Sequence, residues 1–162
     1  MLCVAALGLV LLAVWVFRVL FPSDEKLIRN LLHDLARNAS FEANESALTR
    51  LANAGRLGEF LSADVVLNLD IGDGDSKTIN GRDELIQMAA AAQSTAQGLR
   101  VEFPDINTEV APNGESAIAR VTAKANVPGQ RELYIQELKI ALKKIEGEWK
   151  ITHVDTVKTL KM

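Results

Sequence analysis

The stretch that decides the fold is residues 99–157, LRVEFPDINTEVAPNGESAIARVTAKANVPGQRELYIQELKIALKKIEGEWKITHVDTV. Three turn signals divide it, namely Ala111-Pro112-Asn113-Gly114, Pro128-Gly129 and Glu146-Gly147. Proline followed by glycine suits the centre of a type II turn, and short turns of this kind join antiparallel strands. We therefore predict a meander of four long strands at residues 99–110, 115–127, 131–145 and 148–157.

Alternation along these strands predicts which face of the sheet is buried. In the second strand one face reads Ala117, Ala119, Val121, Ala123, Ala125 and Val127. Because alanine adds little bulk, a helix can lie close to this face or a cavity can remain, so we expect the helices there. In the last strand the same alternation predicts that Trp149, Ile151 and His153 share a face.

Two changes of alternation predict a strongly curved sheet. Apolar positions switch parity at Pro104-Asp105 in the first long strand and at Gln136-Glu137 in the third. One extra residue at each place would restore the apolar face, and such a β-bulge bends its strand.

Three helices and a short hairpin are predicted before the meander. The helices cover residues 24–39, 45–61 and 80–97. Ser23 and Asn80 are the expected N-caps, Gly55 and Gly58 should bend or interrupt the second helix, and His33 falls on the solvated side of the first. The acidic turn at residues 72–75 joins two strands; a calcium loop is the other interpretation, but the glutamate of such loops is missing.

Composition narrows the classes of function. The formal charge of the 162 residues is -3, and no Lys/Arg cluster stands out, so we expect no nucleic-acid partner. The single cysteine, Cys3, lies in the apolar leader, and His33 and His153 are the only histidines. We therefore expect no metal site and no cofactor.

The first 21 residues predict a membrane anchor. Residues 1–17 carry no charge, Arg18 follows, and Pro22 ends the run. As a helix, 21 residues would be about 31 Å long, close to the thickness of the hydrocarbon layer. The alternative, a cleaved signal peptide, lacks a charged beginning and a small-residue cleavage site. We expect residues 1–22 to anchor a body at residues 23–162 in the lipid bilayer as a single-pass membrane protein; the side on which the body lies stays open.

Three short motifs resemble a known family. They are FLSADV at residues 60–65, INGR at residues 79–82 and GEWKI at residues 147–151. With the order of elements, they make residues 24–158 similar to the nuclear transport factor 2-like superfamily, which includes ketosteroid isomerases and SnoaL-like polyketide cyclases. The resemblance implies an α+β cone, in which three N-terminal helices pack on a strongly curved antiparallel sheet, preceded here by one transmembrane helix. The expected lining of a ligand pocket is Leu31, Leu35, Leu67, Leu69, Phe103, Trp149 and Ile151.

The sequence lacks the catalytic pair that a resemblance to the isomerases would imply. The position of the carboxylate base holds Leu69, and the first helix has Leu31 and Leu32 where those enzymes have a tyrosine. The remaining catalytic candidates are His153, oriented by Asp155, and Tyr134; a buried histidine satisfied by a hydrogen bond is the structural interpretation of His153.

Two functions of different classes follow. The first is a membrane-anchored, non-catalytic binding or assembly module, with a homodimer formed through the outer sheet face around Ile118 and Thr122. The alternative is a SnoaL-like isomerase, dehydratase or hydrolase that acts on a small apolar ligand.

Overall fold

The computed structural model describes residues 23–42, 44–72, 75–128 and 133–157. The predicted anchor, residues 1–21, lies outside the described residues, and so do Asp73-Gly74 and Gly129 of two predicted turns. Within the ranges that are described, no helix is both long enough and apolar enough to cross a bilayer.

Three α-helices precede the long strands, as the sequence predicts. They are α2 (Asp24–Ala39), α3 (Ala47–Leu57) and α4 (Arg82–Thr95), with the 3-10 turn η1 (Gly58–Phe60) after α3. Ser23 caps α2, and its hydroxyl accepts a hydrogen bond from the Lys26 amide. Gly58 marks the change to 3-10 geometry, whereas Gly55 lies inside α3 without interrupting it.

The start of α4 differs from the prediction. The N-cap is Gly81, one residue after the predicted Asn80. Gly81 has a φ of 89°, a value that side-chain-bearing residues rarely adopt, and its amide donates to the Val65 carbonyl at 2.7 Å. The glycine therefore makes the sharp turn from the hairpin into the helix.

Seven strands form one sheet in the described part of the chain. They are β1 (Phe41–Glu42), β2 (Leu61–Gly72), β3 (Asp75–Asn80), β4 (Gly98–Val110), β5 (Ser116–Asn126), β6 (Leu133–Ile145) and β7 (Glu148–Thr156). Their spatial order is β1-β4-β5-β6-β7-β2-β3. The four long strands and the β2–β3 hairpin confirm the prediction. The two-residue β1 is too short to leave a pattern in the sequence.

The sheet is mixed, so the prediction of a purely antiparallel sheet was wrong. Strand β2 runs parallel to β7, while every other pairing is antiparallel. Because β7 lies far downstream of β2, no hairpin turn joins them, and alternation alone does not reveal their relative direction.

One of the two predicted bulges is present. The β4–β5 register shifts by one residue between Glu102 and Asp105, which keeps Phe103 and Ile106 on the buried side. The β5–β6 register is continuous from Ser116–Lys143 to Asn126–Leu133, so the bulge predicted at Gln136-Glu137 was wrong. Leu133 and Ile135 therefore lie on the outer face, where their exposed fractions are 54% and 56%.

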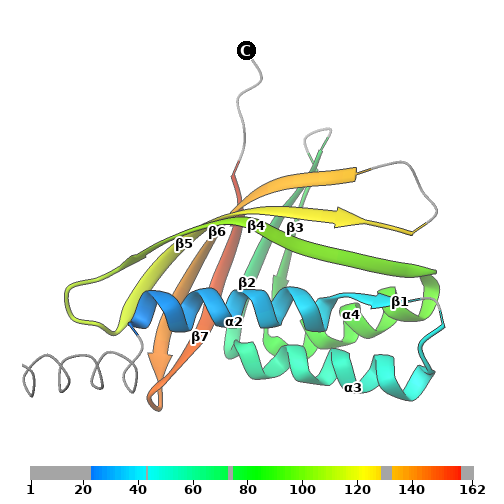
Figure 1. Cartoon of the computed structure of the whole chain (residues 1–162), viewed down its shortest axis with the longest axis horizontal. Helices are drawn as coiled ribbons and strands as arrows, with labels where there is room; N and C mark the ends of the chain where they lie inside the picture. The colour runs from blue at the N-terminus through cyan, green and yellow to red at the C-terminus, as the bar shows by residue number, and fades with distance from the viewer. Residues whose placement is uncertain (1–22, 43, 73–74, 129–132, 158–162) are drawn as a thin grey trace, which may run out of the picture.

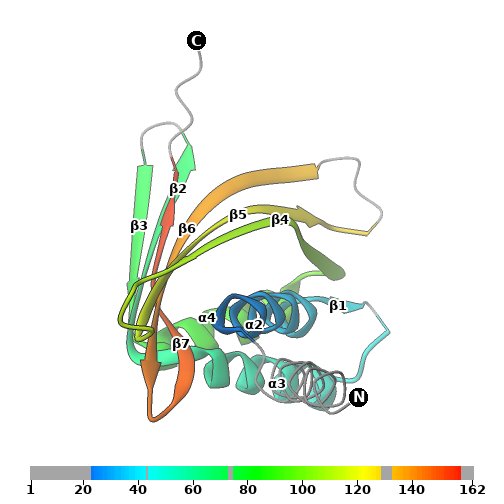
Figure 2. The same cartoon turned by 60° about the vertical axis from the view of Figure 1, so that its left-hand side comes forward.

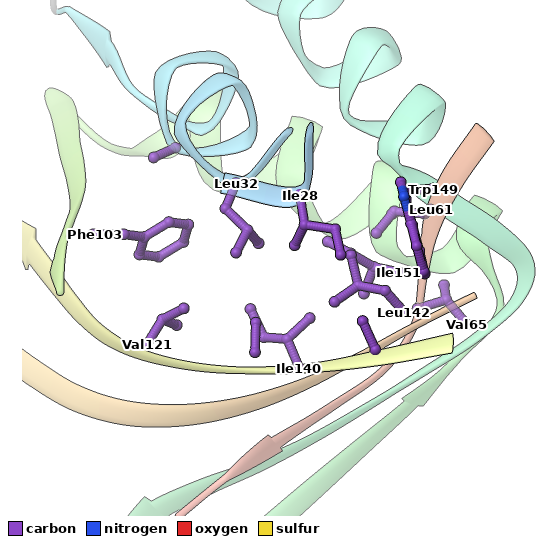
Figure 3. Packing of buried hydrophobic residues seen from close by; sticks show 13 residues of the cluster. Ile28, Leu32, Leu61, Val65, Phe103, Val121, Ile140, Leu142, Trp149 and Ile151 are labelled. Atoms are coloured by element: carbon purple, nitrogen blue, oxygen red, sulfur yellow. The ribbon is translucent and has the colours of Figure 1, made fainter. Parts of the chain in front are cut away.

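The sheet curls over the helices, and α2 lies between the sheet and α3 (Figures 1 and 2). The core fills the space between α2 and the concave face of the sheet (Figure 3). The helix contributes Ile28, Leu32 and Ala36 to it. Ala117, Ala119 and Val121 of β5 are buried there, which confirms the predicted inner face, and Ala123 is partly buried beside them.

The first residue of α2, Asp24, is hydrogen-bonded to the β6–β7 hairpin. The Asp24 carboxylate accepts hydrogen bonds from Lys144 Nζ at 2.8 Å and from Trp149 Nε1 at 3.0 Å. These hydrogen bonds, the Lys144 bond first, lower the pKa of Asp24. The Lys144 ammonium also lies 5.1 Å from the centre of the Trp149 ring. The contact fixes the helix N-terminus against the β6–β7 hairpin.

Enlarging Ala119 tests the inner face. Ala119→Leu should overpack the core and lower the free energy of unfolding by about 1–3 kcal/mol in urea denaturation. Lys124→Gln, on the outer face of the same strand, should change it by less than about 0.5 kcal/mol. Equal tolerance at the two positions would contradict this assignment of faces.

Asp24 predicts a pH dependence of stability. Because its pKa is lowered on folding, the charged form stabilises the fold above the unfolded pKa of about 4, and this contribution is lost as the pH falls through the lower folded value. Asp24→Asn should cost about 1 kcal/mol at pH 7, since the pair is partly exposed, and much less at pH 2. An equal cost at both pH values, measured by thermal unfolding, would argue against the ion pair.

Candidate functional site

A polar cluster occupies the outer face of the sheet where β3, β2 and β7 lie side by side. Its members are Thr78, Asn68, His153 and Asp155. The register pairs Thr78 with Asn68 and Asn68 with Asp155, so the three strands place these side chains in one row. Strand pairing, and not a loop, positions the cluster.

The prediction that His153 shares a face with Trp149 and Ile151 was wrong. A register shift between β6 and β7 leaves Thr152 as an extra residue, because Leu142 pairs with Ile151 whereas Ala141 pairs with His153. Ile151 is buried in the core, but the next paired residue, His153, lies opposite the outward-facing Ala141. The bulge thus turns His153 and Asp155 to the outer face.

The cluster is held by short hydrogen bonds. His153 Nε2 and Asn68 Nδ2 each lie 2.9 Å from Oδ1 of Asp155, and the two nitrogens are 3.1 Å apart. The Thr78 hydroxyl donates to Asn68 Oδ1 at 3.0 Å, which orients the amide with its NH₂ group toward the carboxylate. A carboxylate oxygen accepts only, so we assign the hydrogen to Nε2 of His153.

Hydrogen bonding lowers the pKa of Asp155. The bond from Asn68 is the largest cause of its lowered pKa, partial burial opposes the shift, and the bond from His153 adds to it. Lys139, its partner across β6, lowers the pKa further. Asp155 is an anion at neutral pH, and Asn68, His153 and Lys139 lie around its carboxylate.

The cluster is open to solvent. The side chains of His153 and Asp155 are 38% and 40% exposed to solvent. Small apolar side chains border it in the neighbouring row, where Ile118 pairs with Ala141, Ala141 with His153, and His153 with Val66. A shallow hollow lies over Ile118, Ala141 and Thr152.

The sequence did not predict Asn68 and Thr78 as site residues. Both stand at polar positions of alternating strands, where solvated side chains are expected. Their role depends on the parallel pairing of β2 with β7 and on the β7 bulge, neither of which alternation within one strand shows.

The residues expected to line a ligand pocket divide into three groups. Phe103, Trp149 and Ile151 are buried in the core, and Leu31 and Leu35 pack against it. Leu67 and Leu69 lie on the concave face and are half-buried. Tyr134, the third catalytic candidate, is exposed at the start of β6, paired with Ala125 and far along the strand from the cluster.

The arrangement suits recognition by hydrogen bonds and charge. It offers an anionic carboxylate, an imidazole and Lys139 on an open surface. His33, as predicted, is exposed on α2. Among the side chains that the structure describes, no three His, Cys, Asp or Glu residues are grouped so that they could hold a metal ion.

Several solved structures share this fold. One is a Novosphingobium aromaticivorans protein named "Putative Scytalone Dehydratase", with 13% identity, a TM-score of 0.64 and 83% of each chain covered. A cystatin-like protein of unknown function from Nostoc punctiforme has 16% identity, a TM-score of 0.62, and 84% of this chain and 91% of its own covered. A nuclear transport factor 2-like protein of unknown function from Pseudomonas putida has 14% identity and the same TM-score, with 85% and 88% covered. At these identities the likeness concerns the fold.

The family is shown by sequence. A comparison with curated proteins gives no match. Residues 33–156 match the SnoaL-like domain, a range that begins within α2 and ends at the last residue of β7. The cone of helices and curved sheet, its cystatin-like relatives and this match agree with one another. The chain belongs to the SnoaL-like domain family.

Proposed function

We propose that this chain is a membrane-anchored, non-catalytic binding or assembly module that works through the outer face of its sheet. The observation that carries the proposal is the β7 bulge, which turns His153 and Asp155 away from the interior of the cone. The groups with the chemistry for recognition therefore lie on an open surface.

The inner face supports the same conclusion. Leu69 stands at the position that the isomerase resemblance assigns to the base, and its neighbour on β3 on that face is Lys77. Leu31 and Leu35 of α2 pack against an apolar core. A general base must reach the proton that it removes. The aliphatic side chains at these positions cannot accept a proton.

The outer face is suited to self-association. Across the strands one row reads Asn107, Arg120, Lys139, Asp155, Asn68 and Thr78, and the next carries Ile118, Ala141 and Val66. Arg120 is already paired with Glu109 at 2.9 Å. A surface of mixed charge with small apolar side chains at its centre can meet a second copy of itself across a two-fold axis.

An enzyme of the isomerase, dehydratase or hydrolase type is the alternative. The hydrogen bond between His153 and Asp155 favours it, because a carboxylate that orients an imidazole is a common acid–base device. On the outer face such a pair needs a substrate bound between two copies, since the surface itself is open.

The anchor is tested by extraction. The chain from Met1 should stay in the membrane pellet after alkaline carbonate washing, because an apolar segment of 21 residues inserts stably, whereas a chain that begins at Ser23 should be released. Immunoblotting of pellet and supernatant measures both. Release of the whole chain, or a mature N-terminus near Ser23, would contradict the anchor.

Self-association is tested by a charge placed on the outer face. The chain that begins at Ser23 should be a dimer at micromolar concentration in light scattering, and Ile118→Arg should make it a monomer because a large charged side chain would then lie in the apolar centre of the interface. Gln87→Arg on the exposed side of α4 is the matched control and should remain dimeric. A monomeric parent chain would refute the interface.

His153→Ala and Asp155→Ala separate binding from catalysis. In cells that depend on this gene, both variants should retain function to the extent that they still dimerise. Function lost with an unchanged melting temperature, unchanged dimerisation and unchanged binding of any other partner would show that the pair does chemistry.

A further inference from the structure

The outer surface of α3 is apolar, although α3 is the layer farthest from the sheet (Figures 1 and 2). Leu48 and Leu51 keep 78% and 62% of their exposure, and Ala52 and Gly55 are exposed beside them. On a wheel of about 100° per residue these four fall within an arc of roughly 100°. Ala54 is the buried residue of the helix, so the arc is not the side that packs on the core.

Leu51 also lines a hollow between α3 and α4. Its wall combines the apolar Ala47 and Ala90 with the polar side chains Glu45, Arg50, Gln93 and Ser94. Exposed leucines of this size, grouped on one helix, form a patch of the kind that marks an interaction site. We call residues Leu48, Leu51, Ala52 and Gly55 the α3 stripe.

We propose that the α3 stripe lies in the interface of the lipid bilayer that holds residues 1–21, so that the body is docked on the membrane as well as tethered to it. The inference rests on the proposed anchor, since the anchor selects lipid among the possible occupants of the stripe.

The length of the tether supports this placement. Only Pro22 and Ser23 separate Phe21, the end of the apolar run, from Asp24 at the start of α2. Three steps of extended chain reach about 10 Å. This reach matches the spacing of about 8–10 Å between packed helices, so the tether allows α2 to begin one helix layer above the hydrocarbon while α3 lies in the interface.

Charge supports lipid as the occupant. Within α3 no residue is acidic and Arg56 is exposed at the edge of the stripe, while Arg50 is turned toward the Gln93 carbonyl and the Phe41 ring. On α2, close to the tether, Lys26 and Arg29 are exposed beside the acidic Glu25. Two glutamates flank α3: Glu45 accepts hydrogen bonds from the Glu42 amide and the Asn53 side chain, and Glu59 of η1 is exposed. Leucines beside basic side chains are the composition of interfacial helices.

Depth-dependent quenching tests the docking on the whole chain. In a Cys3→Ser background, Ala52→Cys carries an environment-sensitive NBD label, and Glu137→Cys on the exposed outer sheet face is the control. The chains are reconstituted in phosphatidylcholine–phosphatidylserine vesicles with and without doxyl-labelled lipid. The label at position 52 should shift to the blue and be quenched several-fold more than the label at position 137.

A pair of variants tests the leucines themselves. Leu48→Ser with Leu51→Ser should abolish the quenching at position 52 without changing the melting temperature. Leu133→Ser with Ile135→Ser removes two aliphatic side chains of similar exposure from the sheet and should leave it unchanged. Equal quenching in both double variants would overturn the role of the stripe.

The outcomes distinguish the docking from the anchor. A label at position 52 that is not quenched, on chains that resist carbonate extraction, overturns the docking and leaves the anchor intact. A blue shift without quenching by doxyl lipid means that protein covers the stripe, and it also overturns the proposal. If carbonate releases a chain whose label was quenched, the anchor fails and the docking surface stands as the means of attachment.

Discussion

The close packing of α2 on the concave face of the sheet is the constraint on which the rest of the structure depends. Small side chains at Ala36 of the helix and at Ala117 and Ala119 of β5 leave room for Ile28 and Leu32 to reach the core. Asp24 fixes the direction of the helix by its bonds to Lys144 and Trp149. These side chains fill the space between α2 and the sheet, and the recognition that we propose therefore uses the surfaces of the cone.

Two bulges then determine which side chains reach those surfaces. The bulge in β4 bends that strand and keeps its apolar residues inside. The bulge at Thr152 in β7 has the opposite effect on its strand. It turns His153 and Asp155 to the outer face, although the core residue Ile151, two positions before His153, faces inward. One extra residue thus decides whether the same histidine belongs to an interior site or to an exposed one.

Much of the fold could be predicted from local patterns, but only part of the site: His153 and Asp155 were candidates, whereas Asn68 and Thr78 were not. Caps, glycine turns and alternation are local signals, and they located the helices and long strands and the bulge at Pro104. The false bulge at Gln136 arose because Leu133 and Ile135 are apolar yet exposed, so hydrophobicity did not report burial there. The cluster joins Asn68 to Asp155 across a parallel pairing between distant segments, and no single strand carries a signal for it.

The proposed surfaces are compatible with one orientation of the body. Figure 2 shows α3 on the side of α2 that faces away from the sheet, whereas β2, β3 and β7 form an upright wall of the curved sheet beside the helices. If α3 lies on the bilayer, the outer face of this wall, with His153 and Asp155, is directed along the membrane surface, where a second copy or another partner can reach it. Docking would also remove rotational freedom about the short tether before a partner binds, and less freedom lost on association means tighter binding for the same contact area. The two surfaces would thus act together: one sets the orientation, and the other makes the contact.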